Sequence, residues 1–350
     1  MILLKPKILK FAIMKNIIVL IISTLFLSSC EEMISNDFEV NAPWKDATIV
    51  YSLLEANKDT QFVKIYRAFL GEEGGSAREL ALISDSIYYD TSSVSVFLSK
   101  KPALGSIKLK PIILNDLPEG TFSSSPNIAY FTTEQIDDEI DYDLIIYKND
   151  TITAQTSIVK DNQLFTQSSS SSSINFMSGS TPFDSIISRA IYYYKTPKGV
   201  AYSLDAYFLY EESFDNTFTG TVTDSINWNI QTWKNEDISG ISPHTLIFDG
   251  EDFFNNISSG IESDVNIFRK AYSLKLVLTV GGQELFDYVE YSRPTFSVLL
   301  EKPEFEGNIN GGYGVFSSRI SKSQLRSIHP DTRERLVSDP RTQNLNFVVN

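Results

Sequence analysis

Cysteine and histidine are almost absent from this sequence of 350 residues. It contains one cysteine, Cys30, and two histidines, His244 and His329. Nucleophilic catalysis needs a base within reach of the nucleophile, and that base is most often histidine. We interpret Ser-Pro-His244-Thr as a loop and His329-Pro330 as a helix-ending turn. Gly-x-Ser-x-Gly, His-Glu-x-x-His and phosphate-loop motifs are also lacking, so no pattern indicates a catalytic residue and we predict no enzyme.

Long hydrophobic runs are lacking too. The apolar run Ile17–Leu27 holds eleven residues and follows a short start at Met14-Lys15. As a helix it would be about 16 Å long, whereas the hydrocarbon core of a bilayer is about 30 Å thick. The run therefore predicts the apolar region of a signal peptide, with Met14 as the suitable start because Lys15 then supplies the positive charge.

The segment Leu27-Ser-Ser-Cys30 follows this run directly. It resembles the lipobox of bacterial lipoproteins, and the resemblance implies that Cys30 carries lipid and becomes the mature N-terminus. Acyl chains supply membrane affinity at about 0.8 kcal/mol per buried CH₂. Glu31 and Glu32 come next, and they resemble the acidic signal that sends lipoproteins of Bacteroidota-type bacteria to the outer face of the outer membrane.

Positive charge is scarce, with 30 basic against 44 acidic residues and a net charge of −14. Residues 1–29 hold four lysines and no acid, so the predicted mature chain has 26 basic residues and a net charge of −18. Such a surface repels phosphate backbones, which argues against nucleic acid as a partner.

The composition favours β structure, because 17 Tyr and 23 Phe accompany abundant Ser and Thr. Strand-like runs fill the chain. The clearest hairpin joins Tyr142–Tyr147 to Thr151–Val159, and Ile107–Leu114 carries Pro111, which predicts an edge strand or a bulge. Near the C-terminus we predict that Tyr272–Val280 pairs with a strand at Glu284–Tyr291. Three short helices are predicted, at Glu251–Ile257, Ser323–Ile328 and Thr332–Leu336.

The predicted fold class is all-β. An N-terminal immunoglobulin-like sandwich is followed by a second β-rich domain, sandwich or barrel-like, with a few short helices. A run of six serines, Ser168–Ser173, marks the boundary, and a surface loop within one domain is the alternative. The predicted parts are a signal peptide (1–29), a lipidated tether (30–44), the sandwich (45–165), a Ser-rich linker or loop (166–180) and the second domain (181–350).

These pieces resemble the Bacteroidota-type surface lipoproteins that accompany TonB-dependent outer-membrane receptors. The resemblance depends on the Leu27-Ser-Ser-Cys30 segment with its acids, on the aromatic-rich sandwich and on Gly-Gly-Tyr-Gly-Val-Phe-Ser-Ser at 311–318. It implies an all-β, cell-surface protein and carries over no catalytic residue. In such bacteria Asp-Ser/Thr-apolar sequences are O-glycosylated, which implies four candidate sites: Ser86, Thr151, Ser185 and Ser225.

Two further clusters have open interpretations. Asp137, Asp138, Glu139, Asp141 and Asp143 could hold Ca²⁺ through oxygen ligands, but their spacing favours a solvated acidic loop. A dense group of aromatics could stack on sugar, although most of its members are expected in the core or in cross-strand pairs. The group consists of Tyr192, Tyr193, Tyr194, Tyr207, Tyr210, Trp228 and Trp233.

The sequence thus predicts a lipid-anchored outer-membrane protein, exposed at the cell surface. We expect a non-catalytic binding or scaffolding accessory, with the membrane, a TonB-dependent nutrient receptor or a surface glycan or peptide as partners. No cofactor or metal is predicted. A carboxylate-dependent glycan hydrolase and a structural adhesion component are the alternatives.

Overall fold

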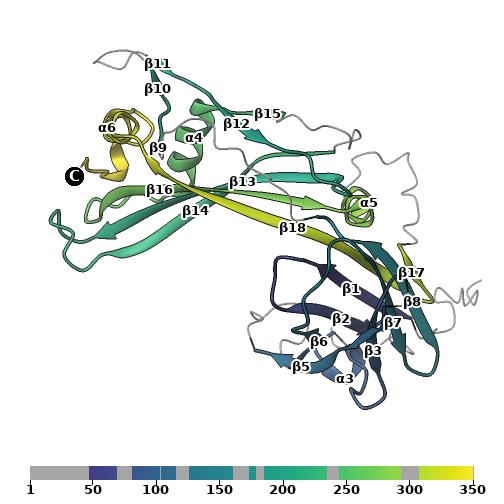
Figure 1. Ribbon diagram of the computed structural model, residues 1–350. Coiled ribbons are helices and arrows are strands. Elements are labelled where there is room, and N and C mark those ends of the chain that lie inside the picture. Colours follow the sequence, from purple (N-terminus) through teal and green to yellow (C-terminus); the bar gives the residue numbers. More distant parts are fainter. Residues whose placement is uncertain are drawn as a thin grey trace, which may run out of the picture. The chain divides into compact units, whose positions relative to one another are not determined.

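The computed structural model is composed mainly of β-strands (Figure 1). It describes residues 47–68, 81–102, 104–115, 126–160, 173–178, 185–234, 244–292 and 307–349. Residues Asp46–Asn350 form one compact unit, and all structural statements concern the described part of it. The predicted all-β sandwich fold with a few short helices is confirmed.

The first half of the chain, together with β17 (Ile309–Asn310) and the start of β18 (Tyr313–Ile328), forms a sandwich of two sheets. One sheet has the order β5-β6-β2-β1-β18 and the other the order β17-β8-β7-β3-β4. Alternate residues of each strand point into the shared core, where Val50 and Val63 of one sheet meet Leu144 of the other. The strands are β1 (Thr48–Leu54), β2 (Gln61–Arg67), β3 (Ser95–Lys100), β4 (Ser106–Lys108), β5 (Lys110–Leu114), β6 (Asn127–Thr132), β7 (Asp141–Tyr147), β8 (Thr151–Ser157) and β17 (Ile309–Asn310).

A second core lies against a sheet of long strands. This sheet runs in the order β14 (Val222–Lys234), β13 (Ala201–Ser213), β16 (Phe268–Gly281) and β18 (Tyr313–Ile328). The covering elements are α4 (Gly250–Gly260), α6 (Pro330–Ser338) and the strand pair β12 (Arg189–Tyr193) and β15 (His244–Phe248) (Figure 1). Aromatic side chains dominate the contact, and Phe176 stacks on Phe253 with ring centroids 4.4 Å apart.

The remaining elements are short. They are α3 (Ser84–Ile87), β9 (Ser173–Ile174), β10 (Met177–Ser178), β11 (Ser185–Ile186), α5 (Gln283–Ser292) and the 3₁₀ helix η2 (Gln343–Leu345).

Strand β18 belongs to both cores. Its first residues pair in parallel with β1, from Tyr313 opposite Ile49 to Ser318 opposite Leu54. Its later residues pair antiparallel with β16, from Arg319 opposite Gly281 to Ser327 opposite Ser273. Segments near opposite ends of the chain therefore share one continuous set of backbone hydrogen bonds.

Two buried serines of β18 join neighbouring elements where its pairing changes. The Ser318 hydroxyl donates to the Ser157 carbonyl at 2.7 Å and accepts the Val159 N–H at 2.8 Å. The Ser317 hydroxyl donates to the Glu284 carboxylate at 2.9 Å. It also accepts the N–H of Leu285 at 3.2 Å, which satisfies one of the free donors at the start of α5.

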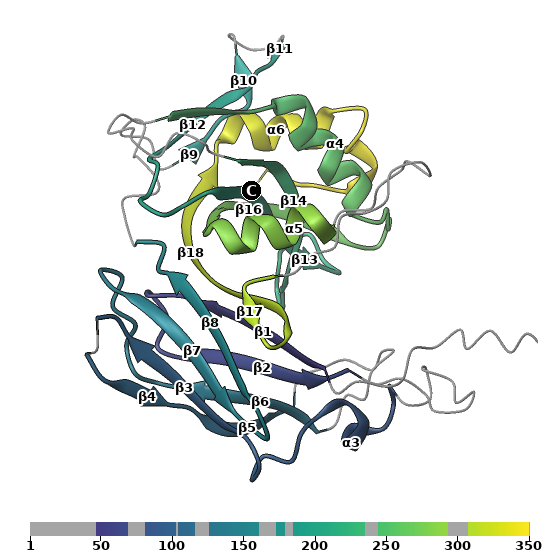
Figure 2. The ribbon, with the colours of Figure 1, turned by 90° about the vertical axis from the view of Figure 1, so that its right-hand side faces the viewer.

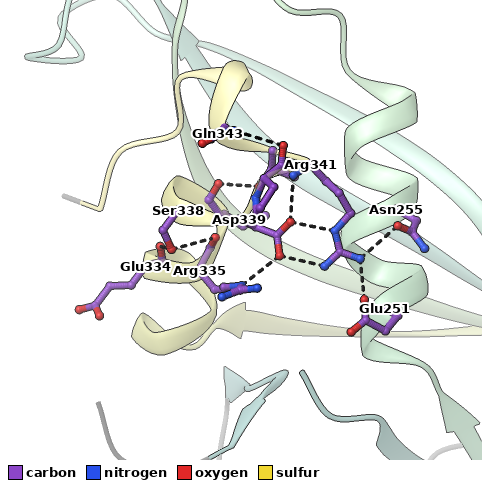
Figure 3. Close-up of polar contacts among 11 residues, drawn as sticks. Glu251, Asn255, Glu334, Arg335, Ser338, Asp339, Arg341 and Gln343 are labelled. Carbon is purple, nitrogen blue, oxygen red and sulfur yellow. Dashed lines mark hydrogen bonds and ion pairs between the residues drawn. The ribbon is translucent and has the colours of Figure 1, made fainter. Parts of the chain in front are cut away.

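A charged clamp closes the C-terminal region (Figure 3). The buried Asp339 carboxylate accepts two hydrogen bonds from the Arg341 guanidinium, both at 2.8 Å, and one from Arg335 at 3.0 Å. Arg341 reaches onward to Glu251 at 2.6 Å and to Asn255 at 3.1 Å, both on α4. Paired, bidentate geometry of this kind makes charge-assisted hydrogen bonds strong. The clamp thus connects the end of α6 to α4.

Several predicted elements are confirmed. The hairpin β7–β8 falls at the predicted residues, and helices α4 and α6 cover Glu251–Ile257 and Thr332–Leu336. The predicted strand Ile107–Leu114 is divided between β4 and β5, which lie in different sheets. Among the described strands, β5 with its Pro111 pairs with β6 alone, as the predicted edge strand does.

Four predictions are wrong. His244 and Thr245 do not lie in a loop but begin strand β15, where His244 is paired with Tyr193. Glu284–Tyr291 is not a strand but part of helix α5, and Ser323–Ile328 is not a helix but the end of strand β18. His329-Pro330 does not end a helix: His329 is the N-cap of α6, and its Nδ1 accepts the Asp331 N–H at 3.3 Å. Pro330 then occupies the first turn, where its missing N–H costs nothing.

The predicted division into domains at 166–180 stays a prediction. Within the described residues, no helix combines the length and the apolar character needed to cross a membrane.

Candidate functional site

The predicted modification residues do not come together. Cys30, Glu31 and Glu32 lie outside the described residues. The four predicted glycosylation residues lie on separate elements, with Ser86 on α3, Thr151 on β8, Ser185 on β11 and Ser225 on β14. Thr151, Ser185 and Ser225 are exposed and Ser86 is half-buried. Their glycosylation stays a prediction.

The acidic cluster spans the loop before β7 and the first residues of that strand, and three of its members form ion pairs with lysines. Asp143 pairs with Lys101 at 2.6 Å, Asp141 pairs with Lys198 at 2.9 Å, and Glu139 pairs with Lys160. The hydrogen bond from Lys198 lowers the pKa of Asp141. Across the described residues, no group of three or more His, Cys, Asp or Glu side chains is arranged to hold a metal ion. The interpretation as an acidic surface loop therefore fits the contacts better than a Ca²⁺ site.

The aromatic group that the sequence singled out is largely structural. Tyr193 and Tyr210 are buried in the second core, and Trp228 and Trp233 pack against it. Trp233 stacks on Tyr202 with centroids 5.5 Å apart. The expectation that most of these side chains belong to the core is confirmed.

A different aromatic surface occupies the outer side of the first sheet. We call it the tyrosine face, and its members are Tyr51 of β1, Phe62, Lys64 and Tyr66 of β2, Tyr288 of α5 and Tyr313 of β18. Val50, Val63 and Ile65 point into the core. Because side chains alternate along a strand, their neighbours on β1 and β2 point away from it. Figure 2 shows β1 and β2 side by side in this sheet.

The rings of the tyrosine face form a connected row. The Tyr51 centroid lies 6.2 Å from that of Tyr66 and 5.9 Å from that of Tyr288, with interplanar angles of 65° and 72°. Tyr66 continues the row to Tyr88, whose centroid is 5.5 Å away. The two pairs that Tyr51 makes are edge to face, which is a favoured arrangement of aromatic rings, and the Tyr66–Tyr88 pair is tilted at 37°. The row therefore has a defined geometry.

Strand pairing places Tyr313 beside Tyr51. Tyr313 lies opposite Ile49, and Val315 lies opposite Tyr51, so Tyr313 and Tyr51 are diagonal neighbours on one side of the sheet. Tyr313 is 57% exposed, Phe62 is 39% exposed and Tyr51 is 36% exposed. Apolar rings that gather on an exposed surface mark interaction sites more often than scattered ones do.

The phenols of Tyr51, Tyr66 and Tyr88 stay protonated at neutral pH. Burial and a hydrogen bond with Tyr288 raise the pKa of Tyr51 to about 12. Burial and the neighbouring Tyr66 raise the pKa of Tyr88 to about 12, and burial raises the pKa of Tyr66. Each hydroxyl can thus donate as well as accept a hydrogen bond.

Lys64 is the cation of the tyrosine face. Its ammonium group lies 5.8 Å from the Tyr66 ring centroid and donates a hydrogen bond to Asn127. Burial lowers its pKa. The face combines aromatic rings, hydroxyl groups and the hydrogen-bonded amine of Lys64. These groups suit ligand binding, and they do not form a paired nucleophile and base.

Sequence reasoning missed this face because its members come from four separate elements. One signal was present: in Gln61–Phe69 neither alternating side of the strand is purely polar. The outward residues Phe62 and Tyr66 explain that pattern.

Comparison with known proteins adds no assignment. A scan against protein-family models and a search of curated proteins found no match to this chain.

Proposed function

We propose that this chain is a lipid-anchored protein of the bacterial outer membrane, attached through Cys30 and exposed at the cell surface. In this proposal it acts as a non-catalytic binding or scaffolding accessory, with a TonB-dependent nutrient receptor as its partner, and its first sandwich is of the immunoglobulin-like kind. The Leu27-Ser-Ser-Cys30 segment supports the anchor. The tyrosine face is the observation that carries the binding role, because it presents ordered aromatic rings to solvent.

The carboxyl groups give more support to binding than to glycan hydrolysis. A glycosidase needs a carboxyl group with a raised pKa as its acid. In the described chain, the carboxyl groups whose pKa departs from the ordinary value all shift downward because of hydrogen bonds that they accept, which in Asp339 outweigh burial. They are Asp90, Asp141, Asp150, Asp215 and Asp339.

Metabolic labelling with a palmitate analogue tests the anchor. The wild-type chain should carry label, sediment with membranes and be digested by protease added to intact cells. Cys30→Ser should lose the label and leave the membrane fraction. Equal sedimentation of the two forms without label would refute the anchor.

Photo-crosslinking in intact cells tests the binding role. A photoreactive amino acid replaces Tyr313 on the tyrosine face or Tyr147 on β7, which is also exposed but lies on the other sheet. The position of Tyr313 should give an adduct whose peptides come from a TonB-dependent receptor, and the position of Tyr147 should not. Adducts from both positions, or from neither, would count against the proposal.

A further inference from the structure

We propose that the tyrosine face binds a proline-rich peptide segment that carries lysine or arginine beside its prolines. This inference rests on the proposed binding function and names the class of ligand that the same face recognises.

The angles between the rings favour a ridged ligand over a flat one. Tyr51 meets Tyr66 at 65° and Tyr288 at 72°, so neighbouring rings stand edge to face and do not form one flat surface. A pyranose stacks on one open, flat ring. A polyproline II helix instead repeats every three residues, about 9 Å, and places prolyl rings into aromatic grooves.

The hydroxyls of the face match the backbone of such a peptide. A polyproline II helix makes no internal hydrogen bonds, so its carbonyl groups remain free to accept. Tyr51 and Tyr66 are half-exposed and Tyr313 is largely exposed. The Tyr51 hydroxyl already shares a hydrogen bond with Tyr288, so the hydroxyls of Tyr66 and Tyr313 are the ones that can donate to the carbonyl groups while the rings contact the prolines.

The charge beside the face selects a basic peptide. Helix α5, which contributes Tyr288, carries Glu284, Asp287 and Glu290 and has no basic residue. Lys64, on the strand side, donates to the neutral Asn127 amide and keeps its positive charge, so the acids of α5 mark the side of the face where a basic residue of the peptide would lie. The chain as a whole has a net charge of −14. Lysine or arginine beside the prolines would therefore be attracted, whereas acidic residues would be repelled.

Fluorescence anisotropy with labelled peptides tests the proposal on the full-length chain purified in detergent. The probe is an oligoproline peptide flanked by lysines. Comparison peptides replace the lysines by glutamates or the prolines by glycine and serine, and neutral glucan and xylan oligosaccharides serve as competitors. The lysine-flanked oligoproline should bind. The glutamate-flanked form should bind at least about tenfold more weakly, and the glycine-serine form should not bind.

Variants locate the binding. Tyr51→Ala and Tyr313→Ala should each weaken binding about tenfold, in line with the energy of one aromatic contact. Tyr313→Ala is the safer variant for folding because that side chain is 57% exposed. Tyr147→Ala is the matched control: its ring also meets a neighbour edge to face, Phe97 at 5.8 Å, but on the opposite sheet. It should bind like the wild type.

Three results would overturn the inference: equal binding of the glycine-serine peptide, unchanged binding by both tyrosine variants, or displacement by neutral oligosaccharide, which would make the face a glycan site. Failure here can be told apart from failure of the proposed function. If no peptide binds but Tyr313 still crosslinks a receptor in cells, the accessory role stands and the proline-rich ligand is wrong.

Discussion

Gly314 lies so close to Val50 that a Cβ atom on Gly314 would be 2.0 Å from the Val50 carbonyl oxygen. Gly314 also has a φ of +108°, a backbone conformation that is unfavourable for residues other than glycine. This contact is where β18 enters the first sheet beside β1. Glycine is therefore required for the strand that both cores share.

Gly314→Ala should lower the free energy of unfolding by about 3 kcal/mol, because steric overlap with backbone adds to the strained φ. Gly220→Ala is the control: its φ is +77° but nothing lies within 4 Å of the added Cβ, so it should cost about 1 kcal/mol. Urea denaturation measures both. Equal losses would show that the Val50 contact does not matter.

Ser318→Ala should destabilise the protein by about 1–3 kcal/mol, because it leaves the Val159 N–H and the Ser157 carbonyl buried without the partner hydroxyl. Ser323→Ala, on the exposed part of the same strand, should change stability by less than about 0.5 kcal/mol. Chemical denaturation of the two variants and the wild type measures these differences in the free energy of unfolding. A neutral Ser318→Ala would mean that water or a backbone shift satisfies both groups.

Asp339 should contribute an acid-dependent part of the stability. Burial acts to raise its pKa, but hydrogen bonds from Arg341 and Arg335 outweigh burial and hold the pKa at about 2, below its ordinary value of 3.8. Because the folded pKa is the lower one, this contribution of about 2 kcal/mol is present above pH 3.8 and is lost as the pH falls toward 2.

Asp339→Asn should remove that contribution, so its stability should differ from that of the wild type at pH 6 but less and less toward pH 2. Glu334→Gln changes an exposed acid on α6, the helix that Asp339 follows, and should keep the wild-type profile. Urea midpoints across this range give the answer. Parallel profiles for Asp339→Asn and the wild type would contradict the clamp shown in Figure 3.

Ionisation of Tyr51 on the tyrosine face should destabilise the protein at alkaline pH. The folded pKa of Tyr51 is raised from 10.0 to about 12 by burial and by Tyr288. Its contribution is thus complete below pH 10 and is lost as the pH rises through 12. Tyr51→Phe should lose less stability than the wild type between these values, as measured by urea midpoints, whereas Tyr147→Phe should follow the wild type. Absorbance at alkaline pH should show the late ionisation of Tyr51 directly.

Helix α5 illustrates where local pattern failed. Glu284–Tyr291 is rich in aromatic and β-branched residues and follows two glycines, which favours a returning strand. In the fold, the Ser317 hydroxyl caps the Leu285 N–H, and Glu284 accepts from Ser317 and from Thr156 at 3.2 Å. The groups that start this helix lie far away in the chain, so no local signal predicted it.

The end of β18 failed in the opposite direction. Ser323–Ile328 contains Gln, Leu and Arg, which favour a helix. The whole stretch is instead held by pairing with β16, from Ser323 opposite Val277 to Ser327 opposite Ser273. Backbone hydrogen bonds to a long, buried partner strand outweigh an intrinsic helix preference of roughly a few tenths of a kcal/mol per residue.

The sequence by itself determined the abundance of β structure, the β7–β8 hairpin and helices α4 and α6, because alternation, turn residues and acidic first turns are local signals. It also determined the chemistry from which the anchor at Cys30 is predicted. Only the tertiary structure decided that β18 serves two cores and that Tyr51, Tyr66, Tyr288 and Tyr313 share one surface. Those relationships depend on pairing between segments hundreds of residues apart, and periodicity along a chain carries no information about which distant segment will become a neighbour.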